Sequence, residues 1–242
     1  MLTSLSVAEF DRDEFISSRF AYRAGEHVTF LAPTQTGKTT LKFELFQHVV
    51  SKQLKAVSLI MKPRDDVPEQ WGKKLKLQRV QDWPPPTWRR KLTDPLGWMV
   101  WPKHTFKPRE DNKRLKNVFE RAINGCYKRG KVILDVDEVY GIAEELDLDE
   151  ELKAVWSRGA SMGCGLWGGS QRPSGIPLLA YSSATHLFIG NTPDRRDRDR
   201  YREISVQGID YDFILEVIED LGNHEWLYIR RRRPVMCIVR AS

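Results

Sequence analysis

Short apolar runs divide this sequence, and between them lie segments whose apolar residues recur every three or four positions. Short apolar runs bounded by turn residues are typical of buried strands, whereas the three-to-four spacing is typical of helices that pack on one face. The predicted strands are 27–31, 56–61, 131–138, 163–171 and 186–190, and the predicted helices are about 41–52, 112–127, an acidic pair within 144–161, 194–205 and 211–221. This alternation predicts an α/β protein with a mainly parallel sheet, covered by helices on both faces.

The two ends of the chain depart from this alternation. Residues 1–26 are predicted to form an N-terminal arm, and residues 27–242 a single domain. The arm carries side chains that are able to pack on the domain, namely Phe15, Ile16, Phe20 and Tyr22. The C-terminal residues predict a β-hairpin, because apolar segments at 225–230 and 235–239 flank a turn through Arg231, Arg232, Arg233 and Pro234.

The segment at about 66–112 lacks sustained periodicity of either kind. It contains three consecutive prolines, five of the eight tryptophans and many Lys and Arg residues, with one predicted strand at 97–101. We interpret it as an elaborated insertion within the domain. Its clustered tryptophans, Trp83, Trp88, Trp98 and Trp101, favour a small core beneath the insertion over a set of rings for stacking on nucleic-acid bases.

A phosphate-binding loop follows the first predicted strand and precedes a predicted helix. Its residues are Ala32, Pro33, Thr34, Gln35, Thr36, Gly37, Lys38, Thr39 and Thr40. They match the pattern G-x-x-x-x-G-K-[ST] with alanine in place of the first glycine, which is tolerated where that residue keeps a negative φ. Backbone N–H groups at a helix N-terminus bind anions, Lys38 is expected to reach the β- and γ-phosphates, and the Thr39 hydroxyl is expected to bind Mg²⁺. The sequence therefore predicts a nucleoside-triphosphate site.

An acidic pair closes the predicted strand 131–138. Asp137 at the carboxyl end of a parallel strand is expected to lie in the ligand crevice and hold Mg²⁺, and Glu138 is expected to orient and activate the attacking water. Asp135 lies two residues earlier on the same face of the sheet. It is either an acid behind the magnesium ligand or, if the register slips by two, the magnesium ligand itself.

A third candidate residue, Gln171, follows the next predicted strand. Because parallel strands end at the same edge, its amide is expected beside Glu138, where it can contact the γ-phosphate or the lytic water. An exposed loop amide without a function is the alternative for this position.

Several of these segments together resemble the HerA/FtsK superfamily of DNA-pumping ATPases. The resemblance rests on 132–141, on Trp156-Ser157-Arg158-Gly159-Ala160-Ser161-Met162-Gly163, on Gly169-Ser170-Gln171-Arg172-Pro173-Ser174 and on Ser183–Gly190 with the final hairpin. Ser170 stands where that family usually has threonine. The motifs occur in the family's order and cover about residues 25–65 and 112–240.

The resemblance implies a RecA-like P-loop core of the catalytic-glutamate type, with an additional strand between the phosphate-loop strand and the acid strand. It also implies a homo-oligomeric ring, hexameric or pentameric, in which Arg158 reaches the neighbouring subunit's nucleotide. An arginine supplied across an interface stabilises transition-state charge. Arg172 or the pair Arg195 and Arg196 are alternatives for that role, and Arg158 is equally explained as a cation near a helix end.

Among DNA pumps, this chain looks most like the compact genome-packaging ATPases of membrane-containing double-stranded DNA viruses, because it shows neither membrane helices nor DNA-tracking domains. The expected function is thus an ATP-hydrolysing translocase of double-stranded DNA that docks at a capsid or portal vertex. Alternatives are an assembly or transfer ATPase resembling the zonula-occludens-toxin group and a HerA-type repair translocase. Two further alternatives are not DNA pumps: a nucleotide-gated scaffold that hydrolyses little ATP, and a small-molecule kinase.

Composition narrows the setting of the protein. No apolar run approaches the roughly 20 residues that cross a bilayer, and the acidic residues near the start argue against a signal peptide. Three isolated cysteines, Cys126, Cys164 and Cys237, are expected to be reduced and buried, as in a cytoplasmic protein. The net charge of +6 permits a polyanionic partner.

The charges are also segregated along the chain. Residues 89–131 contain thirteen Lys and Arg against four Asp and Glu, whereas 135–151 contain nine acids and no base. Sequence-independent contacts with DNA phosphates need such a basic surface, for which Arg230–Arg233 is a second candidate. Solvated charged faces without a partner are the alternative interpretation.

Overall fold

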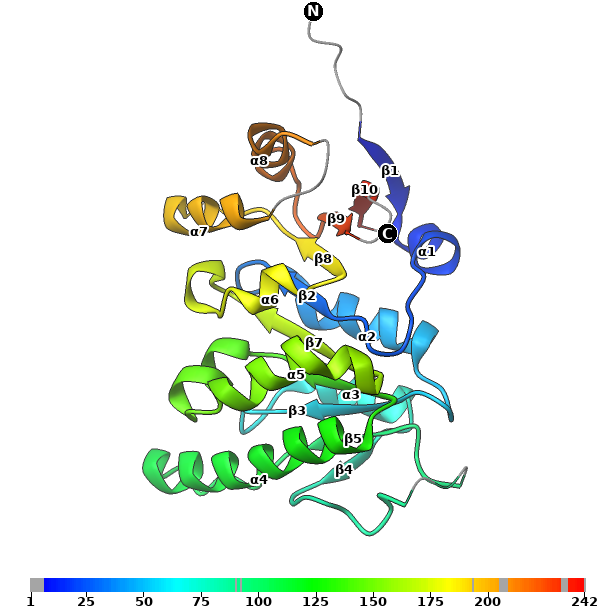
Figure 1. The fold of residues 1–242 in the computed structure, drawn as a ribbon, viewed down its shortest axis with the longest axis vertical. Coiled ribbons are helices and arrows are strands. Elements are labelled where there is room, and N and C mark those ends of the chain that lie inside the picture. The colour runs from blue at the N-terminus through cyan, green and yellow to red at the C-terminus, as the bar shows by residue number, and fades with distance from the viewer. Residues whose placement is uncertain are drawn as a thin grey trace, which may run out of the picture.

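The computed structural model describes residues 7–89, 91, 93–192, 194–204, 209–231 and 235–241. Its central element is a ten-stranded sheet with the strand order β1-β10-β9-β8-β2-β7-β6-β3-β5-β4 (Figure 1). The strands are β1 (Ala8–Asp11), β2 (Val28–Leu31), β3 (Lys55–Leu59), β4 (Gln78–Val80), β5 (Gly97–Val100), β6 (Val132–Val136), β7 (Cys164–Ser170), β8 (His186–Ile189), β9 (Trp226–Arg230) and β10 (Val235–Arg240). The strands from β8 to β4 pair in parallel, and β9 runs antiparallel to β8 and β10. The mainly parallel sheet and the C-terminal hairpin are confirmed, although the predicted turn residues 232–234 lie outside the described part of the chain.

Strand β7 lies between the phosphate-loop strand β2 and the acid strand β6. It pairs in parallel with both, with Val28 opposite Trp167 and Asp135 opposite the same tryptophan on the other side. This is the additional strand that the resemblance predicted. The carboxyl ends of β2, β7 and β6 consequently meet at one edge of the sheet.

Helices cover both faces of the sheet, and each face has its own apolar core. Phe43 and Phe46 of α2 and the Trp71 ring of α3 pack on one face, and the apolar sides of α4, α5, α6 and α8 pack on the other. The helical segments are α1 (Arg12–Glu14), η1 (Phe15–Arg19), α2 (Lys38–Val49), α3 (Asp66–Lys74), α4 (Pro108–Arg129), η2 (Gly141–Glu145), α5 (Asp149–Met162), η3 (Pro173–Gly175), α6 (Leu179–Ser182), α7 (Arg195–Arg200), η4 (Tyr201–Glu203) and α8 (Tyr211–Glu219). The predicted acidic pair is therefore a π-helical turn followed by α5, and the helix predicted at 194–205 is shorter, with its last residue outside the described part of the chain.

The insertion contains more regular structure than its sequence pattern predicts. Besides the predicted strand β5, it contains α3, whose first turn is capped by the Asp65 carboxylate (3.2 Å from the Val67 nitrogen), and the three-residue strand β4. Trp83 and Trp98 are buried, and Trp88 packs at 4.5 Å and 4.8 Å from their ring centroids. Trp83, Trp88 and Trp98 form the predicted core, whereas Trp101 belongs to the apolar core on the other face of the sheet. Elements as short as β4 and α3 hold too few apolar positions to show a period in the sequence.

The N-terminal arm joins the sheet in addition to packing on it. Strand β1 pairs in parallel with β10, so the segments nearest the two ends of the chain lie side by side (Figure 1). Phe15 and Phe20 are buried against the β2, β8 and β9 face, as predicted, with Ile16 and Tyr22 packed beside them. The sheet therefore begins and ends with β1 and β4, which are both short strands.

A buried polar chain joins the end of the arm to β8 and β9. His186 Nε2 lies 3.0 Å from the Glu26 carboxylate, and His186 Nδ1 lies 2.8 Å from the Tyr228 hydroxyl. Burial lowers the pKa of His186 below its usual value. Burial opposes the ionisation of Glu26, but hydrogen bonds from His186 and the Arg23 nitrogen outweigh it and lower the pKa of that carboxyl.

Because of these buried hydrogen bonds among Glu26, His186 and Tyr228, we expect acid to destabilise the fold. Histidine in the unfolded chain binds a proton near pH 6.5, whereas the lowered pKa of folded His186 delays protonation to more acidic pH, so the free energy of unfolding should fall as the pH drops through this range. Glu26 adds a loss at lower pH, because its stabilisation disappears as the pH falls through its lowered folded pKa. Urea unfolding at several pH values measures both. H186N should flatten the first step and H48N, at an exposed histidine, should not; an unchanged slope in H186N would contradict this.

Candidate functional site at the carboxyl edge of the sheet

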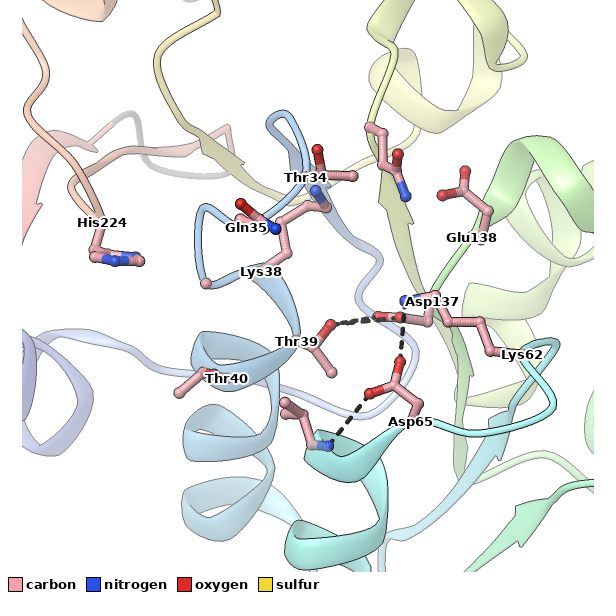
Figure 2. A pocket seen from close by; sticks show the side chains of 13 residues that line it. Thr34, Gln35, Lys38, Thr39, Thr40, Lys62, Asp65, Asp137, Glu138 and His224 are labelled. Atoms are coloured by element: carbon pink, nitrogen blue, oxygen red, sulfur yellow. Dashed lines mark hydrogen bonds and ion pairs between the residues drawn. The ribbon is translucent and has the colours of Figure 1, made fainter.

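A cavity of roughly 350 Å³ opens where β2, β3, β6 and β7 end (Figure 2). It collects residues from segments that are far apart in the sequence. Its lining residues are Thr34, Gln35, Gly37, Lys38, Thr39, Thr40, Lys62, Asp65, Val67, Asp137, Glu138, Gln171 and His224. The candidate residues Lys38, Thr39, Asp137, Glu138 and Gln171 therefore share one cavity.

The phosphate loop forms one wall of this cavity. Gly37 is the N-cap of α2, with φ of 84° and no side chain to cap the helix, so the first N–H groups of the helix remain available to an anion. The remaining loop residues do not line the cavity but close the loop: the Thr36 hydroxyl donates to the Pro33 carbonyl (2.8 Å), and the Ala32 nitrogen donates to the Ser170 carbonyl (3.2 Å). Ala32 is not among the residues with positive φ, which agrees with the expectation for its replacement of glycine.

The Lys38 ammonium folds back onto its own loop. Its Nζ donates to the Ala32 carbonyl (2.5 Å) and the Pro33 carbonyl (2.6 Å). Burial lowers the pKa of Lys38 to about 8, and the carboxylates of Asp137 and Glu138 oppose that shift. A polyanion in the cavity would favour the charged form of this lysine.

The acid pair lies opposite the loop. Asp137 follows β6 directly, and the Thr39 hydroxyl lies 3.3 Å from Oδ1 and 3.4 Å from Oδ2 of its carboxylate. Asp135 lies deeper and is fully buried. Of the two acids, it is Asp137 that contacts Thr39.

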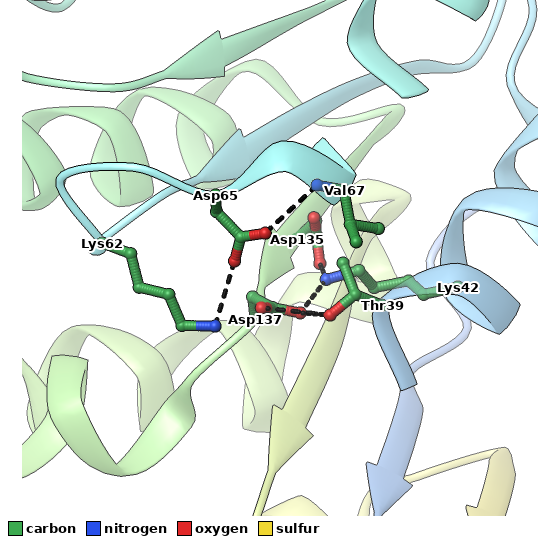
Figure 3. Close-up of polar contacts among 7 residues, drawn as sticks. All are labelled: Thr39, Lys42, Lys62, Asp65, Val67, Asp135 and Asp137. Carbon is green, nitrogen blue, oxygen red and sulfur yellow. Dashed lines mark hydrogen bonds and ion pairs between the residues drawn. The ribbon is translucent and has the colours of Figure 1, made fainter. Parts of the chain in front are cut away.

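A buried lysine links the two acids, and sequence reasoning missed it. Lys42 Nζ lies 3.0 Å from Asp135 Oδ1 and 2.5 Å from Asp137 Oδ1 (Figure 3). Burial would lower the pKa of Lys42, but the two carboxylates outweigh it and raise that pKa to about 12. Burial raises the pKa of Asp135, whereas Lys42 overcomes the burial of Asp137 and lowers the pKa of that carboxyl. An acid in the middle of a buried strand was the available signal, because such a charge requires a cation nearby.

Glu138 and Gln171 both line the cavity. Glu138 follows the end of β6, and Gln171 follows the end of the neighbouring strand β7. Burial and the Asp137 charge raise the pKa of Glu138, and Lys38 and Lys62 oppose this. Gly169 permits the close approach of β6 and β7, since a Cβ at this residue would lie 2.5 Å from the Asp137 carbonyl oxygen. A carboxyl whose pKa is raised toward neutrality suits a general base.

Three further polar lining residues were not predicted. Lys62 Nζ and the Asp65 carboxylate form an ion pair (3.0 Å) where β3 ends, and His224 enters from the loop between α8 and β9 (Figures 2 and 3). In the sequence, Lys62 and Asp65 look like ordinary turn residues after a strand, and no motif includes His224. Only the fold brings them to the phosphate loop.

The donor set fits a magnesium ion. A threonine hydroxyl and a carboxylate are hard oxygen ligands, and Mg²⁺ is usually held by one or two protein groups together with substrate phosphates. Thr39 and Asp137 lie close enough to each other to share one ion. No cluster of three or more His, Cys, Asp or Glu with metal-binding geometry occurs among the described residues.

The candidate arginines lie outside this cavity. Arg158 is exposed on α5, and its guanidinium lies 5.9 Å from the Tyr127 ring centroid. Only Gly163 separates the last residue of α5 from β7, so this end of the helix lies at the amino edge of the sheet. Arg172, Arg195 and Arg196 are also exposed. A residue that serves a neighbouring subunit needs such exposure, so each stays a prediction.

Comparison with known proteins identifies the fold. No protein-family model and no curated protein matches this sequence significantly. Solved structures do match: B204, the DNA-packaging ATPase from Sulfolobus Turreted Icosahedral Virus, has a TM-score of 0.64 and 13% identity over 91% of this chain and 100% of that one. VirB4 of Thermoanaerobacter pseudethanolicus has a TM-score of 0.66 and 9% identity over 89% of each chain. The genome packaging NTPase B204 from Sulfolobus turreted icosahedral virus 2 in complex with AMPPCP has a TM-score of 0.61 and 11% identity over 90% and 99% of the two chains.

This chain has the RecA-like P-loop ATPase fold. These neighbours are HerA/FtsK-type P-loop ATPases, as the resemblance predicted, and at this level of identity the likeness concerns the fold. Within the described part of this P-loop protein, no helix combines the length and the hydropathy required to cross a bilayer.

Proposed function

We propose that this protein is a magnesium-dependent ATPase that moves double-stranded DNA. The observation that carries the proposal is the convergence of Lys38, Thr39, Asp137 and Glu138 on one cavity at the carboxyl edge of a RecA-like sheet. Phosphoryl transfer requires little covalent chemistry from a protein, because positioning and charge stabilisation supply most of the catalysis. This cavity offers groups for both.

Each residue has a proposed part in hydrolysis. The N–H groups of the loop 32–40 bind the phosphates, and Lys38 leaves its loop carbonyls to neutralise charge on the β- and γ-phosphates. Thr39 and Asp137 hold Mg²⁺, which when bound neutralises charge on the phosphate oxygens. Glu138 orients the attacking water and accepts its proton, and the Gln171 amide contacts that water or the γ-phosphate.

The proposal of DNA as the substrate that is moved rests on charge and on fold. The net charge is +6, and five cationic residues, Lys52, Lys55, Lys91, Arg129 and Lys131, line a second cavity at the amino edge of β3 and β6. Contacts between such cationic side chains and DNA phosphates would not depend on base sequence. The other candidate patch, Arg230–Arg233, falls partly outside the described residues.

The proposed assembly is a homo-oligomeric ring of five or six chains in which Arg158, or one of its alternatives, reaches the neighbour's nucleotide. Such a ring would package a viral genome at a capsid or portal vertex, working in the host cytoplasm. The fold shared with B204, described as a DNA-packaging ATPase, supports this choice. VirB4 supports the transfer-ATPase alternative by the same argument.

One experiment tests motor, substrate and assembly together. ATP turnover should rise severalfold on addition of double-stranded DNA of any sequence, and light scattering with a non-hydrolysable ATP analogue should give five or six times the chain mass of 28.2 kDa. Nucleotide binding without turnover would instead identify a scaffold. Phosphate transfer to a small acceptor, unaffected by DNA, would identify a kinase.

A further inference from the structure

His224 lies against the phosphate loop although it belongs to the C-terminal part of the chain. It lines the same cavity as Lys38, and a Cβ built on Gly37 would lie 3.1 Å from its Nδ1 and 3.9 Å from its Cε1. The imidazole therefore lies directly beside Gly37, the N-cap residue of α2.

The cavity has two chemically different ends. Glu138 lies at one end and His224 at the other, with Lys38 and Thr39 between them (Figure 2). In a phosphate loop the lysine reaches the β- and γ-phosphates, and the attacking water lies beyond the γ-phosphate. The end near Glu138 is thus the γ-phosphate end, and the nucleoside must leave the loop toward Thr40 and His224.

The backbone of His224 is held in an uncommon conformation. Its φ is 62°, in the left-handed region that residues other than glycine seldom occupy. Such a conformation is kept where surrounding contacts hold it. Here the carbonyl of His224 accepts a hydrogen bond from Arg12 Nη2 (2.8 Å).

Arg12 of the N-terminal arm thus supports the loop that carries His224, and a second set of contacts holds the same loop from the side of β10. Arg12 also lies 3.6 Å from the Glu44 carboxylate of α2, so it bridges the helix of the phosphate loop and the His224 loop. The Gly222 nitrogen donates to the Glu225 carboxylate (2.8 Å), and Arg240 of β10 pairs with that carboxylate (2.5 Å). The imidazole is thus presented to the cavity by a loop that is fixed from both sides.

We infer that His224 is a nucleotide-binding residue that packs its ring on the nucleoside, and that Arg12 is the positioning residue that holds it there. The inference rests on the proposed nucleotide site and adds to it the subsite for sugar and base, which the phosphate-loop and acid-strand motifs do not provide. A flat ring that stacks on a base stabilises it without selecting one base strongly. The N-terminal arm thereby supports the nucleotide site through Arg12.

The test separates the nucleoside from the phosphates. H224A should weaken the binding of magnesium-ATP about tenfold and leave the binding of magnesium tripolyphosphate, which has no nucleoside, within twofold of wild type. H48A, at an exposed histidine of α2, is the matched control and should change neither affinity. If H224A binds ATP as well as wild type, or loses both ligands equally, the inference is overturned. If the wild-type protein binds neither ligand, the proposed function itself fails.

Arg12 is tested through His224. R12A should weaken ATP binding and spare tripolyphosphate, R12K should restore part of the loss because it retains a donor, and the double variant R12A/H224A should bind ATP no more weakly than H224A alone. Additive losses in the double variant would show that Arg12 acts independently, which would overturn its positioning role.

Discussion

Replacing Glu138 with glutamine should stop ATP turnover while leaving ATP bound. The amide retains the shape of the side chain but cannot accept a proton from water, and loss of a general base costs about 10²- to 10⁴-fold in rate. Nucleotide affinity should change little, because the phosphates are held by the loop, Lys38 and the magnesium ligands. Steady-state phosphate release and equilibrium binding of a fluorescent ATP analogue measure the two quantities separately.

The matched control for this variant is E145Q. Glu145 is an exposed residue of η2, seven positions further along the chain and outside the cavity, so its replacement should leave the rate as in wild type. Equal rates in E138Q and wild type would remove Glu138 from the mechanism. Loss of ATP binding in E138Q would instead show that this carboxyl organises the cavity rather than acting on water.

Replacing Lys42 with methionine should destabilise the fold more than any other single change discussed here. Lys42 and Asp135 are almost completely buried, with side-chain exposures of 2% and 0%, and the lysine neutralises two carboxylates. Removing one partner from a buried ion pair leaves an uncompensated charge and costs about 3–5 kcal/mol. Urea unfolding monitored by tryptophan fluorescence gives the free energy.

Two comparisons identify charge as the cause of this loss. K128M, at an exposed position of α4, should change the free energy of unfolding by no more than about 0.5 kcal/mol. The double variant K42M/D135N should recover part of the loss, because the buried amide needs no cation. If the double variant is less stable than K42M by the full cost of a second core change, packing rather than charge explains Lys42.

The strands with a clear apolar pattern, and the motifs that follow them, could be predicted from the sequence. The strands β2, β3, β6, β7 and β8 each form a buried apolar run, and the loop 32–40 and the acids after β6 carry chemistry at fixed offsets from strand ends. Because parallel strands end at one edge, those offsets also predicted that Lys38, Asp137, Glu138 and Gln171 share a cavity, and they do.

Contacts that depend on tertiary structure could not be predicted in this way. Lys42 occupies an ordinary helix position, and its role appears only when α2 is laid over β6. His224 reaches the phosphate loop through a strained turn near the end of the chain, and no local pattern connects it with Gly37. The strand β1 escaped prediction for a similar reason, since its four residues are stabilised by pairing with β10.

The short strands at the two margins of the sheet have a consequence for encounters between copies of this protein. At one margin Glu9 of β1 is tied to Arg240, and at the other the three residues of β4 include Arg79, whose guanidinium is stacked over Trp101. A long, flat and apolar edge strand can pair with a strand of another molecule and so start aggregation. Short edge strands that carry charged side chains disfavour this pairing. We therefore expect contacts between copies of this protein to involve helices and loops and not pairing between the edges of their sheets.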